Sequence, residues 1–474
     1  MIKQWRLDTQ NQSLVLSSLG NRLPCVIYWG DRLPSHESPD EMFEASKKDW
    51  GDNLIDLVPE LSILPEQTAN FAGQLGCKIR DLSGQLLSSS FVFSADKTST
   101  NSVTLIYKDK DLGLTYTATI DAMIEDDVFA LGAKIESIDP VIMEWLSAPV
   151  IETSLLSDEM VDYGGHWGGE FRKQTTPWVT GVHLRESRTG TTSHAHFPGL
   201  IIPSVGSSEN AGSCYGFHYG WSGGHRMVAE QLQDGRKQIQ FGHTENSELT
   251  PRTSFETAKL YITHSSDGIG GVGCNFRGFV SNSIVDLPKD SIRPVHYNCW
   301  EAIYFDHSIE ELKEIVTLAA DIGAERFVLD DGWFKSRNNA KSSLGDWFVD
   351  NQKYPEGLHP LIKHIHSTGM TFGLWFEPEM VSPDSDLFRS HPDWIMGEAS
   401  QSLGRGQYVL DISIKKVQEY LFERIDSLLN EYPIEYIKWD HNRVLPYPDA
   451  SQTRALYSLL GDLREAHPDL EIES

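Results

Sequence analysis

The sequence has few cysteines. Five occur in 474 residues, an odd number, and none forms a Cys-x-x-Cys pair. This scarcity argues against a disulfide framework and a cysteine-based zinc site, and it is typical of a reducing compartment. Long hydrophobic runs are also missing: no stretch of about 18 apolar residues occurs, and residues 1–8 lack the apolar segment of a secretory signal. Together these absences predict a cytoplasmic location.

Basic residues are scarce relative to acidic ones. The chain has 40 Lys and Arg against 68 Asp and Glu, which gives a net charge of −28. Such a polyanion repels phosphate backbones and anionic lipid, so neither nucleic acid nor a membrane surface is expected as a partner. A neutral small-molecule substrate fits this charge. The apolar share of 39% is ordinary for a globular protein, and the length suffices for two or three domains.

Helical periodicity is scarce in residues 1–285. Short apolar runs such as residues 103–107 and 114–120 recur there, separated by Gly, Asp, Asn and Ser. This pattern predicts an N-terminal β-sandwich domain over residues 1–285.

Two motifs in this part could suggest a bound group. His194 and His196 alternate as two metal ligands on one strand face would, but no third ligand is evident nearby. The Gly-rich segment 163–171 lacks the strand-then-helix context of a phosphate loop and is more typical of a turn. We therefore predict neither a metal site nor a cofactor.

From residue 286 onward, strand-like and helical segments alternate. Ser308 and Glu311 form a capping box, and Gly369 ends a later helix. The alternation predicts a parallel α/β arrangement over residues 286–474. The predicted strands are residues 295–300, 326–331, 371–377, 436–440 and 470–474, and the predicted helices are residues 308–323, 358–368, 415–429 and 454–466.

Polar and aromatic residues gather where these strands end. Functional side chains at the C-terminal ends of successive strands are typical of a (β/α)8 barrel. A doubly wound sheet is the alternative, but it would need a Gly-rich phosphate loop after its first strand, and residues 297–301 are not one. The strand-end residues are Trp300, Glu301, Asp330, Asp331, Trp375, Glu377, Lys438 and Asp440.

Lys438 and Asp440 lie two residues apart on a predicted strand and therefore share a face. A lysine beside a carboxylate keeps that carboxylate ionised, as the nucleophile of a retaining glycosidase must be. A structural ion pair explains the spacing equally well. Carboxylates joined by tryptophans suit a sugar, and residues 330–333 combine two aspartates with an aromatic floor. A helix N-cap is the other interpretation of those aspartates.

A metal enzyme is a further alternative. Asp331, Glu377 and Asp440 on different strands could bind one Mg²⁺, with Lys438 as general base, as in enolase-type enzymes. This hypothesis leaves the tryptophans without a role.

Five ordered segments resemble bacterial α-galactosidases of glycoside hydrolase family 36. Two segments of the N-terminal part resemble the same family, so the similarity runs from about residue 20 to residue 474. The segments are residues 296–302, 329–334, 344–347, 373–380 and 436–443, with residues 164–171 and 193–198 in the N-terminal part.

The resemblance implies an N-terminal β-supersandwich, a catalytic (β/α)8 TIM barrel and a C-terminal β-domain. It implies a retaining exo-α-galactosidase that acts on terminal α-galactosyl residues of melibiose- and raffinose-type oligosaccharides. Asp440 matches the nucleophile of its double displacement, and no cofactor is implied. The residues that match sugar-binding positions are Trp300, Asp330, Asp331, Trp375, Arg405, Lys438 and Asn442.

Two departures accompany the resemblance. Relatives are often homo-oligomers, frequently tetramers, with a loop of a neighbour near the site, but residues 64–80 match that loop poorly. The family's acid/base aspartate matches a position beyond Ser474, so the barrel is expected to be truncated after about the start of strand 5 and the chain to be an inactive fragment. Glu377 and Glu379 are the nearest other acids.

Three other functions are compatible with the same residues. They are an α-N-acetylgalactosaminidase, a galactosyl transferase of the raffinose-synthase kind, and a non-catalytic sugar-binding protein.

Overall fold

The computed structural model describes residues 2–47, 58–192, 195–285 and 292–474. The chain divides into two compact units. Unit 1 comprises Met1–Asp286 with Pro448–Ala450, and unit 2 comprises Leu287–Tyr447 with Ser451–Ser474.

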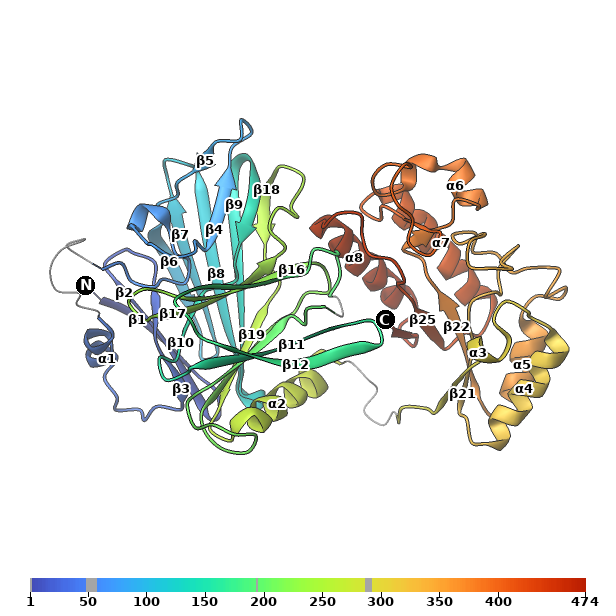
Figure 1. The fold of residues 1–474 in the computed structure, drawn as a ribbon, viewed down its shortest axis with the longest axis horizontal. Helices are drawn as coiled ribbons and strands as arrows, with labels where there is room; N and C mark the ends of the chain where they lie inside the picture. The colour runs from blue at the N-terminus through green and yellow to red at the C-terminus, as the bar shows by residue number, and fades with distance from the viewer. Residues whose placement is uncertain (1, 48–57, 193–194, 286–291) are drawn as a thin grey trace. The chain divides into compact units, whose positions relative to one another are not determined.

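Unit 1 is built from antiparallel sheets, as Figure 1 shows. Its largest sheet has twelve strands in the described residues: β4 (Cys77–Arg80), β5 (Leu86–Leu87), β6 (Val92–Thr98), β7 (Ser102–Asp109), β8 (Leu114–Met123), β9 (Val128–Leu146), β11 (Glu159–His166), β12 (Gly169–Pro177), β14 (Gly199–Pro203), β15 (Cys214–Tyr219), β18 (Arg252–Glu256) and β19 (Leu260–Ser265). A second sheet contains β10 (Ile151–Thr153), β13 (Gly181–Glu186), β16 (His225–Gln231) and β17 (Lys237–His243). A third contains β1 (Ile2–Asp8), β2 (Gln12–Leu19) and β3 (Cys25–Asp31).

The predicted β-rich N-terminal part is confirmed, and its cause is the period of two in the sequence. In β8 every second side chain is buried, and β7 pairs with it so that Leu105 and Tyr107 face the same core as Tyr116. This burial supplies most of the stabilisation of such a sheet.

The sequence pattern did not predict two helices of unit 1, α1 (Pro39–Ser46) and α2 (Gly268–Phe279). Helix α2 packs on β15 and β19 (Figure 1). A side chain at Gly216 of β15 would lie 2.4 Å from Val272 of this helix. Glycine at position 216 therefore lets α2 lie close against the sheet. The position of this helix depends on that tertiary contact, and the periodicity of the sequence does not reveal it. Short turns η1 (Gln67–Ala69) and η2 (Ile124–Asp126) and the π-turn η3 (Val280–Ile284) complete the described helical segments of this unit.

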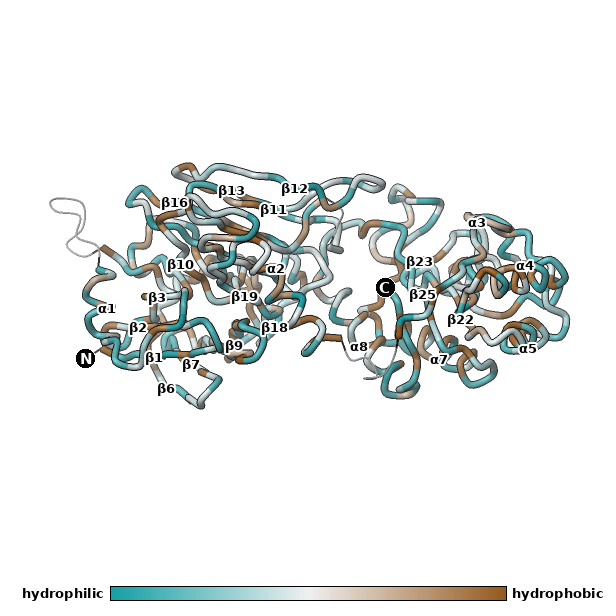
Figure 2. Tube along the Cα trace, turned by 90° about the horizontal axis from the view of Figure 1, so that it is seen from below, coloured by the Kyte–Doolittle hydropathy of each residue, from teal (hydrophilic) through white to brown (hydrophobic). Residues whose placement is uncertain are grey.

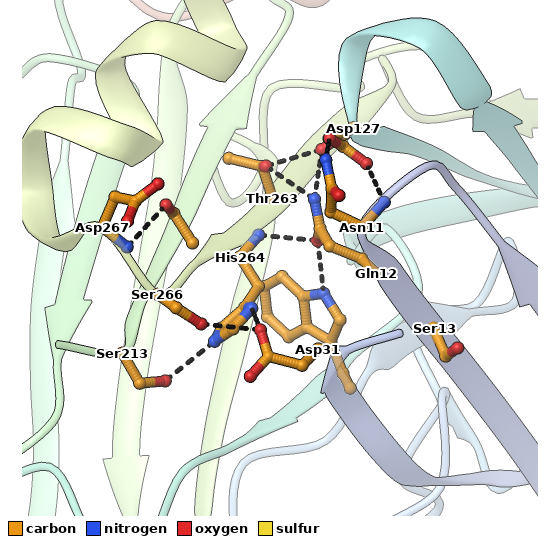
Figure 3. A network of polar contacts seen from close by, with 12 residues as sticks. Asn11, Gln12, Ser13, Asp31, Asp127, Ser213, Thr263, His264, Ser266 and Asp267 are labelled. Carbon is orange, nitrogen blue, oxygen red and sulfur yellow. Dashed lines mark hydrogen bonds and ion pairs between the residues drawn. The ribbon is translucent and has the colours of Figure 1, made fainter. Parts of the chain in front are cut away.

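A buried polar network joins β2 to the large sheet of unit 1 (Figure 3). The amide nitrogen of Gln12 donates to the Asp127 carbonyl (2.5 Å) and to Thr263 Oγ1 (3.1 Å). Its oxygen accepts from the His264 backbone N–H (2.7 Å) and from Trp29 Nε1 (3.3 Å). Because each polar atom of this buried amide has a partner, the network fixes β2 against the large sheet without leaving the Gln12 side chain unpaired.

Of the two histidines considered as metal ligands, His194 lies outside the described residues. His196 forms an isolated bridge with Gly164 instead of lying in a continuous strand.

Unit 2 contains a five-stranded parallel sheet with the order β20 (His296–Asn298), β21 (Arg326–Leu329), β22 (Thr371–Phe376), β25 (Tyr436–Trp439) and β26 (Glu471–Glu473). All four strand pairs are parallel. Strands in chain order and in one direction are the arrangement of a (β/α)8 barrel, so the predicted α/β fold is confirmed. The described strands β23 (Met380–Val381) and β24 (Tyr408–Val409) form a separate small ladder.

The helices of unit 2 alternate with these strands. They are α3 (Trp300–Ile303), α4 (Ile309–Asp321), α5 (His359–Ser367), α6 (Asp386–Ser390), η4 (Pro392–Trp394), α7 (Lys415–Glu431) and α8 (Ala450–Ala466). Ser308 caps α4 as predicted, accepting from the Glu311 backbone N–H. Hydrophobic and hydrophilic residues alternate along α4, α5 and α7 (Figure 2). No described helix is long and apolar enough to cross a membrane.

The first predicted strand is shorter than expected. It ends at Asn298, and Trp300 begins α3 instead of extending the strand. The Asn298 side-chain oxygen accepts from the Trp300 backbone N–H (2.8 Å), a local bond that competes with continued strand pairing.

Candidate active site

Four acidic residues lie at the C-terminal ends of the parallel strands. Asp330 and Asp331 follow β21, Glu377 follows β22, and Asp440 follows β25. All four are buried or partly buried. Since parallel strands end at one edge of the sheet, these separate parts of the sequence meet there.

Asp440 is held by three N–H donors. The His441 backbone N–H donates to Oδ1 (2.9 Å), and Trp375 Nε1 (3.3 Å) and Asn442 Nδ2 both donate to Oδ2. Its own backbone N–H donates to the Phe376 carbonyl of β22 (2.8 Å). These bonds fix the direction of the carboxylate, which a nucleophile requires.

Lys438 pairs with Asp330 and not, as the spacing suggested, with Asp440. Lys438 Nζ lies 2.8 Å from Asp330 Oδ2, so the pair spans β22, which separates β21 from β25. Burial opposes the charge of the ammonium, but the hydrogen bond and charge of Asp330, together with the charge of Asp440, raise the Lys438 pKa. The lysine therefore remains a cation between two strand-end aspartates.

Asp330 accepts two further bonds. Asn298 Nδ2 donates to Oδ2 (2.5 Å), and the Asp331 backbone N–H donates to Oδ1 (2.8 Å). Asp331 is bound in a fork by the guanidinium of Arg337, at 2.9 Å and 2.8 Å, and Arg337 is 1% exposed. Burial raises the Asp331 pKa, while Arg337 acts in the opposite direction.

A neutral histidine supports the turn after these aspartates. His307 Nε2 lies 3.0 Å from the carbonyls of Asp331 and Tyr304, so it must be the protonated nitrogen, and Nδ1 accepts from Tyr354 Oη (2.6 Å). Burial lowers the His307 pKa to about 4. Gly332 has φ +115°, and a Cβ there would lie 2.6 Å from His307 Nε2. Only glycine therefore fits this turn.

The tryptophans differ in their environment. Trp375 is 2% exposed and stacks on Phe334, so its indole N–H on Asp440 is its contribution to the polar site. Trp333 is fully buried and belongs to the core, so the predicted aromatic floor is wrong for this residue. Trp300 is partly buried on α3 and packs edge-on against Tyr304 and Phe305.

Glu377 and Glu379 bind the segment that carries Asp440. Glu377 accepts from the Asn442 backbone N–H (3.0 Å) and from Gln407 Nε2 (3.1 Å), and it is 1% exposed. Burial and the charge of Asp440 raise the Glu377 pKa to about 7. Glu379 accepts from Trp439 Nε1 (3.0 Å) and lies 3.3 Å from His441 Nδ1. Burial opposes the imidazolium charge, but Glu379 raises the His441 pKa.

Arg405 lies outside this network of hydrogen bonds. It is exposed in a tight turn, with φ +52° and with glycines on both sides, and Gln407 N–H donates to the Gly404 carbonyl across the turn (2.9 Å). Its charge reaches Glu377, whose pKa it lowers.

The comparisons with known proteins agree on one family. The sequence model described as "Glycosyl hydrolase family 36 N-terminal domain" matches residues 22–249, and the model described as "Melibiase" matches residues 254–474. An α-galactosidase of Escherichia coli is 36% identical over 491 residues, which cover 100% of this chain and 68% of that protein. The chain belongs to glycoside hydrolase family 36.

Other family 36 members extend this similarity. The α-galactosidase AgaA of Geobacillus stearothermophilus is 36% identical over 330 residues, which cover 65% of this chain and 45% of AgaA. A crystal structure of an AgaA variant in complex with 1-deoxygalactonojirimycin has a TM-score of 0.92 at 26% identity, covering 100% of this chain and 72% of that one. The chain thus spans about two thirds of the E. coli relative and under half of AgaA in the sequence comparisons.

The geometry of this family 36 site does not favour the magnesium hypothesis. Arg337 already binds both oxygens of Asp331, one of the three carboxylates that would have held the ion. Within the part of the chain that the structure describes, no group of three or more His, Cys, Asp or Glu side chains is placed to hold a metal.

The sequence pattern missed several residues of this site. Asn298 could have been found, because it is a polar residue at a strand end. Arg337, Gln407 and Arg443 could not, because they reach the site from loops or beyond a strand end and no periodicity marks them.

Proposed function

We propose that this chain carries the galactose-binding residues and the nucleophile of a retaining exo-α-galactosidase. The observation that carries the proposal is the Asp440 carboxylate, oriented by three N–H donors beside the Lys438–Asp330 pair. Asp440 would attack C1 of a terminal α-galactosyl unit, forming an ester as the C1–O bond to the leaving group breaks. Water would later cleave that ester.

The sugar-binding roles follow from the polar atoms that line this edge. We assign the galactose hydroxyls to Asp330, Asp331, Lys438 and Asn442, with Trp300 as a wall, Arg405 as a further sugar-binding residue, and Trp375 as the residue whose indole N–H orients Asp440 within the sugar site. Carboxylates accept from vicinal hydroxyls, and a cationic Lys438 donates to them. Solved AgaA variants are described as complexes with raffinose and with stachyose, which supports oligosaccharides of the raffinose type as the substrate.

We assign the acid/base role to no residue that the structure describes. A retaining enzyme needs a second carboxyl group about 5–5.5 Å from the nucleophile. Glu377 is poorly suited, because it is 1% exposed and both its oxygens accept bonds from Asn442 and Gln407. We therefore expect galactose binding but little turnover from the 474-residue chain alone.

Calorimetry of the purified chain tests this function. Galactose and 1-deoxygalactonojirimycin should bind to the wild type and to Asp440→Asn, whereas Asp330→Ala should lose binding. Hydrolysis of an aryl α-galactoside by the chain alone would contradict the expected inactivity. Preference for N-acetylgalactosamine would favour the N-acetylgalactosaminidase alternative, and trisaccharide formed with sucrose would favour the transferase. Failure of every sugar to bind would reject the proposal.

We also propose a cytoplasmic location and a homo-oligomeric state. The five cysteines are free, and four of them are buried, which suits a reducing compartment. Sedimentation velocity of the purified protein tests the oligomeric state, since a monomer at all concentrations would reject it.

A further inference from the structure

The turn that carries Arg405 belongs to a loop of residues 396–407, called here the Arg405 loop. The loop is held internally near its start, where Gln401 Nε2 donates to the Met396 carbonyl (2.8 Å). Arg405 itself has a positive φ, which is unfavourable for a residue with a Cβ. A turn in such a conformation keeps its shape only when its surroundings fix it.

Arg443, in the segment that carries Asp440, holds the Arg405 loop from one side. One of its terminal nitrogens donates to Gln401 Oε1 (2.8 Å) and to the Ser402 carbonyl (2.8 Å). Its aliphatic stem packs on the backbone of Gly404, where an added Cβ would lie 2.7 Å from Arg443 Cγ. The residue immediately before Arg405 therefore rests on Arg443.

The other end of the loop is tied to the same segment through Glu377. Gln407, two residues after Arg405, donates to Glu377, and Glu377 also accepts from the Asn442 backbone N–H. The Arg443 contacts and the Glu377 contacts thus both connect the Arg405 turn to residues 440–443.

The burial of Arg443 is costly for a purely structural residue. It is 7% exposed, and its guanidinium donates to neutral oxygens of Gln401, Ser402 and Val444. Burying a guanidinium is unfavourable unless its bonds compensate, and an apolar side chain of similar length would fill the same space. What arginine adds there is one terminal nitrogen that donates to two oxygens of the loop and a second that donates to the Val444 carbonyl of its own segment.

We propose that Arg443 is a positioning residue that holds the Arg405 turn ready for an α-galactosyl ligand. This inference rests on the proposed function. Arg443 does not touch the sugar; it removes the need to order the turn when the sugar binds, which raises affinity. Its contribution should therefore disappear when Arg405 is absent.

A double-mutant cycle with galactose as the probe tests the inference. Calorimetry should show about tenfold weaker binding for Arg405→Ala and about fivefold weaker binding for Arg443→Met. The double variant should bind no more weakly than Arg405→Ala alone. Gly404→Ala, whose Cβ would displace the Arg443 stem, should reproduce the loss of Arg443→Met and should not add to it.

Arg389→Met is the matched control, because Arg389 is an exposed arginine of unit 2 that pairs with Asp384 and Asp386. It should leave affinity unchanged. Additive losses in the double variant, or no loss in Arg443→Met, would each overturn the inference while leaving the proposed function in place. No loss in Arg405→Ala would overturn the inference together with the sugar-binding role proposed for Arg405. A wild type that binds no galactose would instead reject the proposed function, and this inference with it.

Discussion

Lys438 of β25 donates a hydrogen bond to Asp330 at the end of β21, across the intervening strand β22, with 2.8 Å between Nζ and Oδ2. The Asp330 side chain is 5% exposed and that of Lys438 is 30% exposed. The pair links the C-terminal ends of β21 and β25, at the edge of the sheet where the proposed sugar site lies.

Lys438→Met should destabilise unit 2 and abolish sugar binding. It leaves the Asp330 carboxylate buried without its cation, which costs about 2 kcal/mol for a pair whose lysine is partly exposed. Urea denaturation measures the loss. Lys335→Met is the control, because Lys335 and Asp386 are each 60% exposed and should contribute under about 0.5 kcal/mol. The double variant Lys438→Met with Asp330→Asn should recover stability but not galactose binding. Equal effects of the two lysine variants would contradict the importance of the pair.

Glu377 should make the stability of the protein depend on pH. Its pKa is raised from 4.5 to about 7, so between these values the folded protein holds a proton that the unfolded chain has released. The stabilisation from this group is therefore fully present below pH 4.5 and is lost as the pH rises through 7.

Glu377→Gln removes this titration and should abolish this part of the pH dependence. The free energy of unfolding of the variant, relative to the wild type, should rise by about 3 kcal/mol across that window, since one pKa unit corresponds to about 1.4 kcal/mol. Urea denaturation at a series of pH values measures the difference. A difference that stays constant with pH would show that Glu377 does not titrate there.

Gln12→Leu should destabilise unit 1. It removes four hydrogen bonds at once and leaves the buried N–H groups of Trp29 and His264 without the acceptor that Gln12 supplies, while the Asp127 carbonyl keeps its bond from Thr263 (Figure 3). The expected loss is about 3 kcal/mol, seen as a lower urea midpoint. Gln10→Leu, at an exposed position of the same segment, should change stability by under about 0.5 kcal/mol. An unchanged midpoint in Gln12→Leu would mean that the network adds nothing to the fold.

Much of the site could be predicted from the sequence, because strand order alone places it. Asp330 and Asp440 follow buried runs of apolar residues, and parallel strands bring their ends to one edge whatever the loops do. The alternation of apolar residues in β8 likewise predicted a half-buried strand.

The partners of these residues could not be predicted in the same way. The spacing of Lys438 and Asp440 suggested that they pair, yet the distance across the sheet to Asp330 depends on its curvature, which the sequence pattern does not contain. The Arg337 fork on Asp331 and the Arg443 bonds to the Arg405 loop depend on loop conformations. Trp333 was expected to face a sugar, but the core of unit 2 takes it up entirely.

A covalent label shows directly whether Asp440 is the nucleophile. With 5-fluoro-α-D-galactosyl fluoride, an Asp440 oxygen would bond to C1 as the C1–F bond breaks and fluoride leaves, a step that needs no proton from an acid/base residue. Mass spectrometry of digested protein should find one fluorogalactosyl group on the peptide containing Asp440, and none in Asp440→Asn. A label on another carboxylate, or no label on a protein that binds galactose, would show that Asp440 is not the nucleophile.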